Sequence, residues 1–375
     1  MIFFGNIGKF GIAVFMKGIE YEKGLMTAAL SIVLLLTGCG QAETAENTET
    51  ENETMITENT AVTEITDDEN SPFAKHGKLS VDGASLVDKN GEKFRLYGMS
   101  THGLAWFPQY VNHDAFETLL NDWNTNCVRL SMYTYENGGY CTDGNKDNLK
   151  ELIKSGVSYA DELGMYVIID WHVLNDKDPN VYKDEAKNFF EEMTELYKDH
   201  DNIIYEICNE PNSTAEWSDI KAYADEVIPV IRNNDSDAVI IVGTPTWSQD
   251  IDKALADPLD YDNIMYALHF YADTHTQWLR DRAESCIESG LPVFISEFNI
   301  CDASGRGNVN IEEGDKWYEL IDKYDLSYMC WSLANSPDSC SVLSMQNSKL
   351  SGWTEDDLSE TGKWVYSRFV SEKNS

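Results

Sequence analysis

Two short apolar runs in this 375-residue sequence each have a glutamate at or near their end. Residues 203–211 carry Asn209 and Glu210 near their end, and residues 291–297 end on Glu297. Apolar, β-branched runs of this length are typical of strands that are covered on both faces. If both strands belong to one parallel sheet, their two carboxyl groups face one pocket. Such a pair could carry out glycoside hydrolysis, which needs one protonated carboxylic acid and one ionised carboxylate.

The elements that would position these acids alternate along the chain. Strands are predicted at 94–100, 127–133, 165–171, 203–209, 238–243, 263–271, 292–297 and 327–331, with helices between them, for example at 148–163, 184–198, 217–232, 276–289, 311–324 and 357–370. Eight strands, each followed by a helix, predict an α/β fold of the (β/α)8 TIM-barrel type. An open doubly wound sheet is the alternative. The first strand lacks a glycine-rich phosphate loop, which argues against its nucleotide-binding form.

Two short alternating runs precede the first barrel strand. They contain the turn dipeptides Asp-Gly at 82–83 and Asn-Gly at 90–91. This pattern predicts a short N-terminal β-hairpin. We expect it to cap the amino end of the barrel.

Residues 1–39 have the layout of an export signal. Lys23 precedes an apolar run at 25–36 that is short for a membrane span, and the run closes on Leu-Thr-Gly-Cys39. This ending resembles the bacterial lipobox, whose cysteine is acylated; an ordinary secretory signal is the alternative. We place the true translation start at Met16, because the preceding residues are unusually apolar. We therefore expect an exported bacterial protein, a cell-surface lipoprotein or a secreted one, that meets the membrane only through a lipid anchor on Cys39.

Residues 40–71 hold ten acidic residues and no basic one. A segment of this composition cannot bury enough apolar surface to fold, so it predicts a disordered linker before a catalytic domain at 72–375. The whole chain has a net charge of −37, and residues 72–375 alone carry 25 basic and 53 acidic residues. Because such a charge repels phosphates, we expect no nucleic acid partner.

The eight cysteines form no CxxC pair and no spacing typical of a metal site. Cys127, Cys208 and Cys330 fall inside predicted strands, where cysteine behaves as a small apolar residue. The sequence therefore predicts neither a zinc site nor a disulfide framework. A single loop disulfide that involves Cys141 or Cys340 stays open.

Polar or aromatic side chains stand at the carboxyl ends of nearly all predicted strands. In a (β/α)8 barrel these ends surround one pocket, and burying so many polar groups is costly unless they are paired. One such residue could be a satisfied core group, but the whole set predicts an active site. The set is His102, Arg129, Tyr133, His172, Asn209, Glu210, His269, Tyr271, Glu297 and Trp331.

Seven pieces of sequence place these residues in a recognisable order, at 98–106, 128–133, 168–172, 205–211, 269–271, 295–298 and 331–333. Together they resemble glycoside hydrolase family 5, and its bacterial endo-β-1,4-glucanases (cellulases) most closely. The similarity runs from about residue 78 to the last helix. The Asn-Glu-Pro piece alone is only moderately specific, whereas the seven in this order and spacing are strongly so.

The resemblance implies an endo-acting, retaining hydrolase of cellulose-like or mixed-linkage β-glucans. We expect it to need no cofactor or metal and to be a monomer. By family position, Glu210 is the general acid/base and Glu297 the nucleophile. We expect Arg129 to keep Glu297 ionised and Tyr271 to donate a hydrogen bond to it. Neighbouring negative charge should raise the pKa of Glu210, so that it keeps its proton.

The remaining candidates are expected to bind substrate. Asn209 should bond the 2-hydroxyl of the sugar at the cleavage point. The others should bond sugar hydroxyls, position the carboxylates or stack on sugar rings: His102, Trp106, Tyr133, His172, His269 and Trp331. For Trp106, packing at the top of the barrel is a strong alternative. We assign Glu206 and Asp170 to structural or orienting roles.

One departure from the family pattern lies after Trp331. Related endoglucanases usually carry a lysine there that reaches sugar hydroxyls, but this chain has Ser336-Pro-Asp. The preference among glucans is therefore open, with β-mannan, xylan or xyloglucan as alternative substrates. A surface glucan-binding protein with little turnover is a second alternative. A Mg²⁺-dependent barrel enzyme of the enolase type is a third, but we find neither its three converging carboxylates nor its strand-end lysine.

Overall fold

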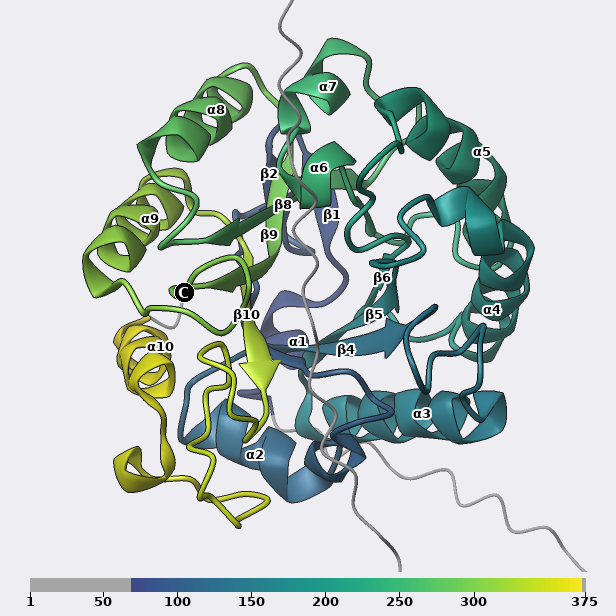
Figure 1. The fold of residues 1–375 in the computed structure, drawn as a ribbon. Coiled ribbons are helices and arrows are strands. Elements are labelled where there is room, and N and C mark those ends of the chain that lie inside the picture. The colour runs from purple at the N-terminus through teal and green to yellow at the C-terminus, as the bar shows by residue number, and fades with distance from the viewer. Residues whose placement is uncertain (1–68, 373–375) are drawn as a thin grey trace, which may run out of the picture. The chain divides into compact units, whose positions relative to one another are not determined.

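The computed structural model describes residues 69–372, so the predicted export signal, Cys39 and nearly all of the predicted linker lie outside the described residues. Eight parallel strands close into a barrel in the order β10-β3-β4-β5-β6-β7-β8-β9, and helices surround it (Figure 1). This confirms the predicted TIM barrel. The strands are β3 (Tyr97–Thr101), β4 (Cys127–Tyr133), β5 (Tyr166–His172), β6 (Ile203–Glu206), β7 (Ile240–Val242), β8 (Ile264–Tyr271), β9 (Val293–Asn299) and β10 (Tyr328–Leu333).

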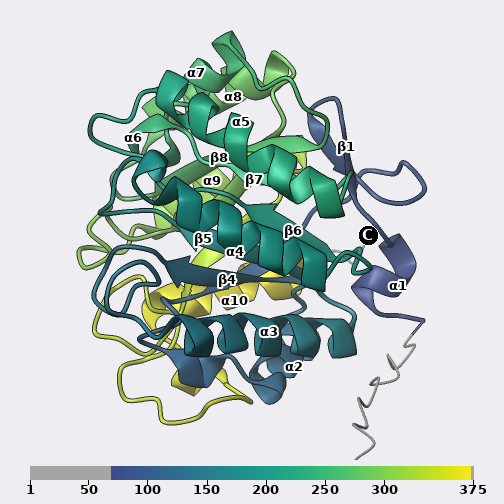
Figure 2. The same ribbon diagram turned by 90° about the vertical axis from the view of Figure 1, so that its right-hand side faces the viewer.

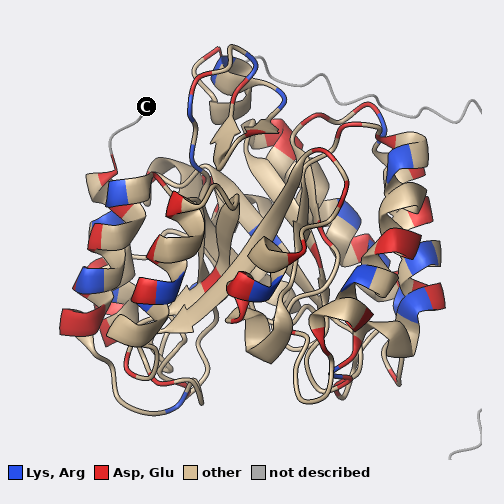
Figure 3. Cartoon of the chain, turned by 90° about the horizontal axis from the view of Figure 1, so that it is seen from above, with Lys and Arg blue, Asp and Glu red and all other residues tan. Residues whose placement is uncertain are grey.

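The helices follow the strands around the outside of the barrel. They are α2 (His113–Asn121), α3 (Lys146–Leu163), α4 (Lys183–Leu196), α5 (Trp217–Asn234), α6 (Pro245–Ser248), α7 (Ile251–Ala256), α8 (Gln277–Glu288), α9 (Ile311–Tyr324) and α10 (Glu360–Ser371). Short 3-10 helices lie at η1 (Pro108–Tyr110), η2 (Pro179–Tyr182) and η3 (Glu355–Asp357). Lys, Arg, Asp and Glu lie mainly on the helices and loops, whereas the strands are largely free of them (Figure 3).

Several helices begin at a side chain that caps the first turn. Asn112, Asn145, Asn310 and Ser359 precede α2, α3, α9 and α10, and each accepts a hydrogen bond from a backbone N–H of that turn. Such caps satisfy amide groups that have no partner within the helix. Because each helix runs antiparallel to its strand, these capped N-termini lie at the carboxyl end of the barrel.

The strand register brings polar side chains into rows. Tyr133 pairs with His172, Asp170 pairs with Glu206, and His269 pairs with Glu297. The strands also approach closely: a Cβ on Gly98 would lie 1.9 Å from the carbonyl oxygen of Cys127. Only glycine fits at this crossing of β3 and β4.

One predicted strand is shorter than expected. The run 203–209 was predicted to be a strand throughout, but β6 ends at Glu206. Beyond it, the Asn209 and Glu210 amides still bond the carbonyl oxygens of Trp171 and Val173 on the β5 side. Both ladders of β6 end at Glu206, and beyond it the chain keeps single backbone hydrogen bonds to both neighbours, including one from Ile207 to Ile241. Asn209 and Glu210 lie past the strand, not at its tip.

The N-terminal hairpin closes the amino end of the barrel, as predicted. Strands β1 (Ser80–Asp82) and β2 (Ser85–Val87) pair antiparallel, and α1 (Pro72–His76) precedes them (Figure 2). Leu79, Leu86 and Phe94 pack against inward-facing strand residues in one apolar cluster. This cluster fills the amino half of the barrel interior.

Two further findings concern residues 69–372. Their seven cysteines are all free thiols, so the loop disulfide left open above does not form. No helix in this range combines the length and apolar character that a bilayer crossing needs.

Candidate active site

A cleft of about 690 Å³ opens at the carboxyl end of the barrel. Arg129 and Asn209 do not line this cleft, because both are fully buried behind its wall. The other predicted site residues do line it: His102, Trp106, Tyr133, His172, Glu210, His269, Tyr271, Glu297 and Trp331. The structure thus brings the predicted set together and divides it into an outer layer and a supporting one.

The two glutamates lie next to each other in the cleft. One oxygen of Glu210, one oxygen of Glu297 and a ring nitrogen of His269 lie within 4.8 Å of one another. Glu210 is 8% exposed and Glu297 is 4% exposed. The two carboxyl groups therefore meet in a largely desolvated place.

Glu297 receives hydrogen bonds that favour its ionised form. The Tyr271 hydroxyl donates to Oε1 at 2.7 Å, and Nη1 of Arg129 lies 3.5 Å from Oε2. Burial, followed by the charge of Glu210, nevertheless raises the pKa of Glu297, while His269 and Arg129 oppose this rise. The expected contacts of Arg129 and Tyr271 are present, and they offset part of the desolvation cost.

A chain of hydrogen bonds surrounds Glu210. Its Oε1 lies 3.0 Å from Nδ1 of His269, whose Nε2 lies 2.9 Å from the Ser296 hydroxyl. That hydroxyl in turn donates to Glu206 at 2.8 Å, and Glu206 accepts from Arg129 at 2.7 Å. Because Ser296 has only one proton to give, Nε2 of a neutral His269 must donate to it. Nδ1 is then an acceptor, so the proton between His269 and Glu210 belongs to Glu210.

The pKa values agree with this assignment. Burial lowers the pKa of His269 to about 4, so the ring is neutral near pH 7. Burial also raises the pKa of Glu210 to about 8. The sequence-based expectation gave neighbouring negative charge as the reason, which is wrong in emphasis: burial is the main cause, and Asp170 and Glu206 add to it.

Arg129 organises the supporting layer. Its guanidinium bonds Glu206, Asn209 and Asp170 at 2.7, 2.7 and 3.0 Å, besides its contact with Glu297. A buried charge is tolerated only when it is paired and hydrogen-bonded in this way. Arg129 is thus a positioning residue that acts from behind the cleft.

Asn209 is held more tightly than the sequence suggested. Its Oδ1 accepts from Arg129, and its Nδ2 donates to Nε2 of His172 at 3.1 Å and lies 3.3 Å from the Val173 carbonyl. The Nδ1 of His172 bonds Asp170 at 2.6 Å, so Asp170 orients this ring as expected. Asn209 therefore positions other groups in this structure, and the predicted contact with a sugar hydroxyl stays a prediction.

Aromatic rings line one side of the cleft. Trp331 stacks on His172 with ring centres 5.2 Å apart, and its ring centre lies 5.0 Å from that of His102. Trp106 lies 4.6 Å from Tyr133 and stays 37% exposed. Trp106 is thus open to the cleft, which favours a stacking role over simple packing.

Sequence reasoning missed several residues on the opposite side. Trp247, Gln249 and His275 line the cleft, and Trp247 is 42% exposed. Thr246, Trp247 and Ser248 all have φ values of 55° to 59°, in the left-handed region. Strain of this kind is retained mainly at functional sites. No local sequence pattern predicts a left-handed turn made of Thr, Trp and Ser.

Ser336, which stands where the family usually has a lysine, has a structural role here. Ser336 bonds Ser341 at 2.6 Å and does not line the cleft. Arg306 lines the cleft from the β9–α9 loop, and Asp338 holds it at 2.8 Å. Among the described residues that line the cleft, Arg306 is the one Lys or Arg, so its positive charge comes from a different loop.

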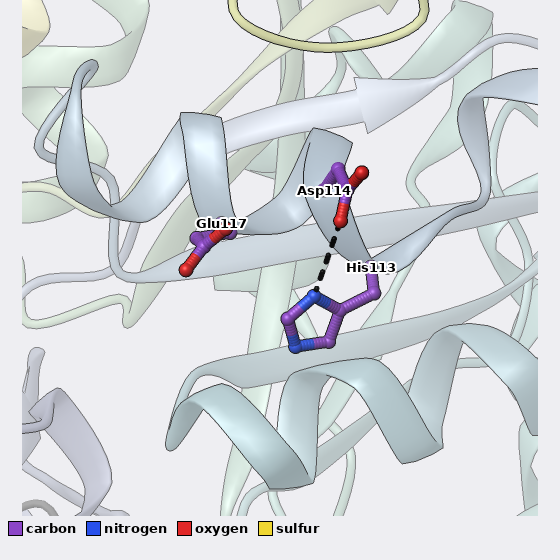
Figure 4. A group of neighbouring side chains, drawn as sticks. All are labelled: His113, Asp114 and Glu117. Atoms are coloured by element: carbon purple, nitrogen blue, oxygen red, sulfur yellow. Dashed lines mark ion pairs between the residues drawn. The ribbon is translucent and has the colours of Figure 1, made fainter.

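Another group of possible metal ligands lies away from the cleft. His113, Asp114 and Glu117 come together at the start of α2, and Nδ1 of His113 lies 3.7 Å from Asp114 (Figure 4). All three are at least partly exposed. Acidic side chains in the first turn of a helix are stabilised by the helix dipole, which explains this group without an ion.

A closed (β/α)8 barrel with two adjacent, largely buried glutamates in a cleft at the carboxyl end of its strands is typical of a glycoside hydrolase of the barrel type. Residues 87–337 match the family described as cellulase, glycosyl hydrolase family 5, and the chain belongs to this family. The catalytic domain is that of an endo-acting β-glucan hydrolase, an endoglucanase.

Named relatives agree with this assignment. The chain is 48% identical to Endoglucanase A of Butyrivibrio fibrisolvens over 80% of its own length and 70% of that protein. It is 46% identical to an endoglucanase of Clostridium saccharobutylicum over 77% of its own length and 64% of that protein. The catalytic domain of endoglucanase Cel5A from Thermobifida fusca superposes with a TM-score of 0.77 at 35% identity, over 80% of this chain and 100% of that domain.

Proposed function

We propose that this protein cleaves internal β-1,4-glucosidic bonds of cellulose-like or mixed-linkage β-glucans with retention at the anomeric carbon. The observation that carries the proposal is the spacing of Glu210 and Glu297, whose nearest ligand oxygens lie within 4.8 Å. Retaining enzymes hold their carboxyl groups about 5–5.5 Å apart, whereas inverting enzymes need about 6.5–9.5 Å to admit a water.

In the first step, Glu297 attacks the anomeric carbon as Glu210 passes its proton to the departing glycosidic oxygen. The Tyr271 hydroxyl and Arg129 hold the attacking carboxylate in place. The bond to the leaving chain breaks and a glycosyl ester with Glu297 forms. Glu210 is left ionised beside the acceptor nitrogen of His269.

In the second step, a water enters from the leaving-group side. Glu210 removes its proton while the water oxygen attacks the anomeric carbon, and the ester bond to Glu297 breaks. Glu210 regains its proton, and two inversions give net retention. The same residue therefore serves as acid and then as base.

The substrate class rests on the relatives and on the cleft. A variant of the Thermobifida fusca enzyme has been solved in complex with cellotetraose, at 35% identity to this chain. Exposed tryptophans on both sides of the glutamates favour a polymer that runs across the cleft. The replacement of the usual lysine by Ser336, with Arg306 nearby, is the reason to compare several polysaccharides.

The test is release of reducing sugar from carboxymethyl cellulose, barley β-glucan, mannan, xylan and xyloglucan by the purified protein and its Glu297→Gln variant. We expect release from the first two, reduced at least about 10⁴-fold in the variant. Proton NMR of early products should show the β-anomer first. Faster release from mannan, xylan or xyloglucan would reassign the substrate, and no release from any polymer would leave the glucan-binding alternative.

We also propose that the protein is exported and held at the cell surface by acylation of Cys39, and that it acts as a monomer. The Leu-Thr-Gly-Cys39 ending and the acidic segment after it support this location. Metabolic labelling with an alkyne fatty acid should mark the protein, and Cys39→Ser should abolish the label. Cys141→Ser, which changes a half-buried thiol, should keep it.

A further inference from the structure

Trp278 is an exposed tryptophan that the mechanism above does not use. It lies in the first turn of α8 and is 46% exposed. Because α8 follows β8, this turn lies at the carboxyl end of the barrel, the same end as the cleft. A single exposed apolar ring is ordinary on a protein surface, so the case for Trp278 rests on its position and its contacts.

Two contacts hold the Trp278 ring beside the cleft. His275, which lines the cleft, meets it edge to face with ring centres 5.9 Å apart. Arg282 lies over the ring at 5.6 Å and donates to the carbonyl oxygen of Gln249 at 3.1 Å and to Asp250. Gln249 also lines the cleft. The indole therefore contacts one cleft residue directly, His275, and is connected to a second, Gln249, through Arg282.

Barrel order places Trp278 on the leaving-group side. Trp106 follows β3, and Trp247 follows β7, which lies opposite β3 in the eight-stranded ring. The proton donor Glu210 follows β6, next to β7, so the departing chain leaves over β7 and its neighbours. Trp278 follows β8, which is the next strand after β7.

We propose that Trp278 is a binding platform for glucosyl units of the departing chain, farther from the cleavage point than the unit that meets Trp247. This inference rests on the proposed function. The C–H face of a glucopyranose ring is apolar and packs on an indole, as other flat apolar faces do. An extra platform lengthens the cleft, so the enzyme should favour long chains over short ones.

The test compares substrates that differ only in their leaving-group side. Trp278→Ala should lower kcat/KM for cellohexaose by about 3- to 10-fold, the loss expected for one aromatic contact. For a nitrophenyl β-cellobioside, which has no sugar on that side, kcat/KM should stay within about twofold. With end-labelled cellohexaose, the preferred cleavage site should move toward the reducing end, because fewer units are then held beyond the cleavage point.

Two further variants separate this role from a structural one. Trp278→Phe keeps a ring and should restore most of the cellohexaose activity. Leu196→Ala removes an apolar side chain of similar exposure, 48%, at the other end of the barrel and should change neither substrate.

Equal losses on both substrates, or an unchanged cleavage pattern in Trp278→Ala, would overturn the platform while leaving the endoglucanase assignment intact. If the unaltered protein hydrolyses neither substrate, the proposed function itself fails. The two failures are therefore distinguishable.

Discussion

The two ends of the barrel fill their interior with opposite kinds of side chain. At the amino end, Leu79, Leu86 and Phe94 from the hairpin region pack against apolar strand residues. At the carboxyl end, the fully buried Arg129 is surrounded by carboxylates and an amide, and Glu206 is equally buried. The amino end buries apolar side chains, and the carboxyl end buries charged ones.

This difference separates stability from chemistry. Burial of apolar surface stabilises a fold by about 25 cal/mol per Å², whereas a buried charged network at best offsets its own desolvation. Within the barrel interior, the amino end therefore supplies apolar burial that stabilises the fold. The carboxyl end is free to hold groups such as Glu210 and His269 with shifted pKa values. The predictions below test that division.

The largest expected effect is at the carboxyl end. Glu210→Gln removes the proposed proton donor, so kcat/KM on barley β-glucan should fall by about 10²- to 10⁴-fold. Its free energy of unfolding should stay the same or rise, because a buried ionisable group is removed. Polysaccharide kinetics and urea unfolding measure the two. An aryl cellobioside with a good leaving group should lose less in the first step, and a marked loss of stability would break the comparison.

At the amino end, a substitution should lower the free energy of unfolding and leave the activity unchanged. Phe94 is 4% exposed and stacks on His76 with ring centres 3.9 Å apart. Phe94→Ala should lower the free energy of unfolding by about 3–5 kcal/mol, with kcat and KM unchanged below the unfolding transition. Phe94→Leu, the control, should cost less than about 1.5 kcal/mol. A change in kcat would mean that the hairpin end reaches the active site.

The hydrogen-bond chain predicts a smaller effect that appears in the pH profile. The proposed mechanism needs protonated Glu210, so activity should fall as pH rises through the Glu210 pKa of about 8. Ser296→Ala removes the acceptor of His269 Nε2 and permits the tautomer whose Nδ1 donates to ionised Glu210. That donation lowers the pKa of Glu210, so the alkaline limb of kcat/KM should move down by about one pH unit.

The other charged groups around Glu210 stay in place in that variant, namely Arg129, Asp170, Glu206 and Glu297. Ser296→Thr keeps the hydroxyl, so the alkaline limb of its kcat/KM profile should stay at the pH of the unaltered protein. If the Ser296→Ala enzyme is slower but the alkaline limb of its kcat/KM profile does not move, Ser296 only supports the structure.

The smallest effect should come from surface charge at the amino end. Nζ of Lys78 lies 3.1, 3.1 and 2.6 Å from Asp201, Asp235 and Asp237. Two of these three carboxylates are well exposed, so Lys78→Met should lower the free energy of unfolding by at most about 1 kcal/mol. The loss should shrink in high salt, and kcat should not change. A loss above about 2 kcal/mol would mean that ion pairs, and not the apolar cluster alone, secure the hairpin.

Much of the fold was readable from local patterns. All eight barrel strands and their order follow from apolar runs and the helices between them, because a strand buried on both faces needs a nearly continuous apolar sequence. Boundaries were less accurate: β6 ends at Glu206, although the Ile207 amide still bonds Ile241 on β7 and the Asn209 amide still bonds Trp171 on β5. A run of apolar residues predicts which segment is buried, but it does not predict the residue at which regular strand pairing stops.

By itself the sequence determined the barrel, the hairpin at its amino end and the two glutamates that face one cleft, because residue type and strand position suffice for these. Only the tertiary structure decided that Asn209 is held by Arg129 and His172, and that Glu210 is buried against His269, with burial raising its pKa. It also decided that Trp247 lines the cleft and that Trp278 contacts the cleft residue His275. Such contacts join residues from strands and loops far apart in the chain, and they exist only once the barrel has closed in its register.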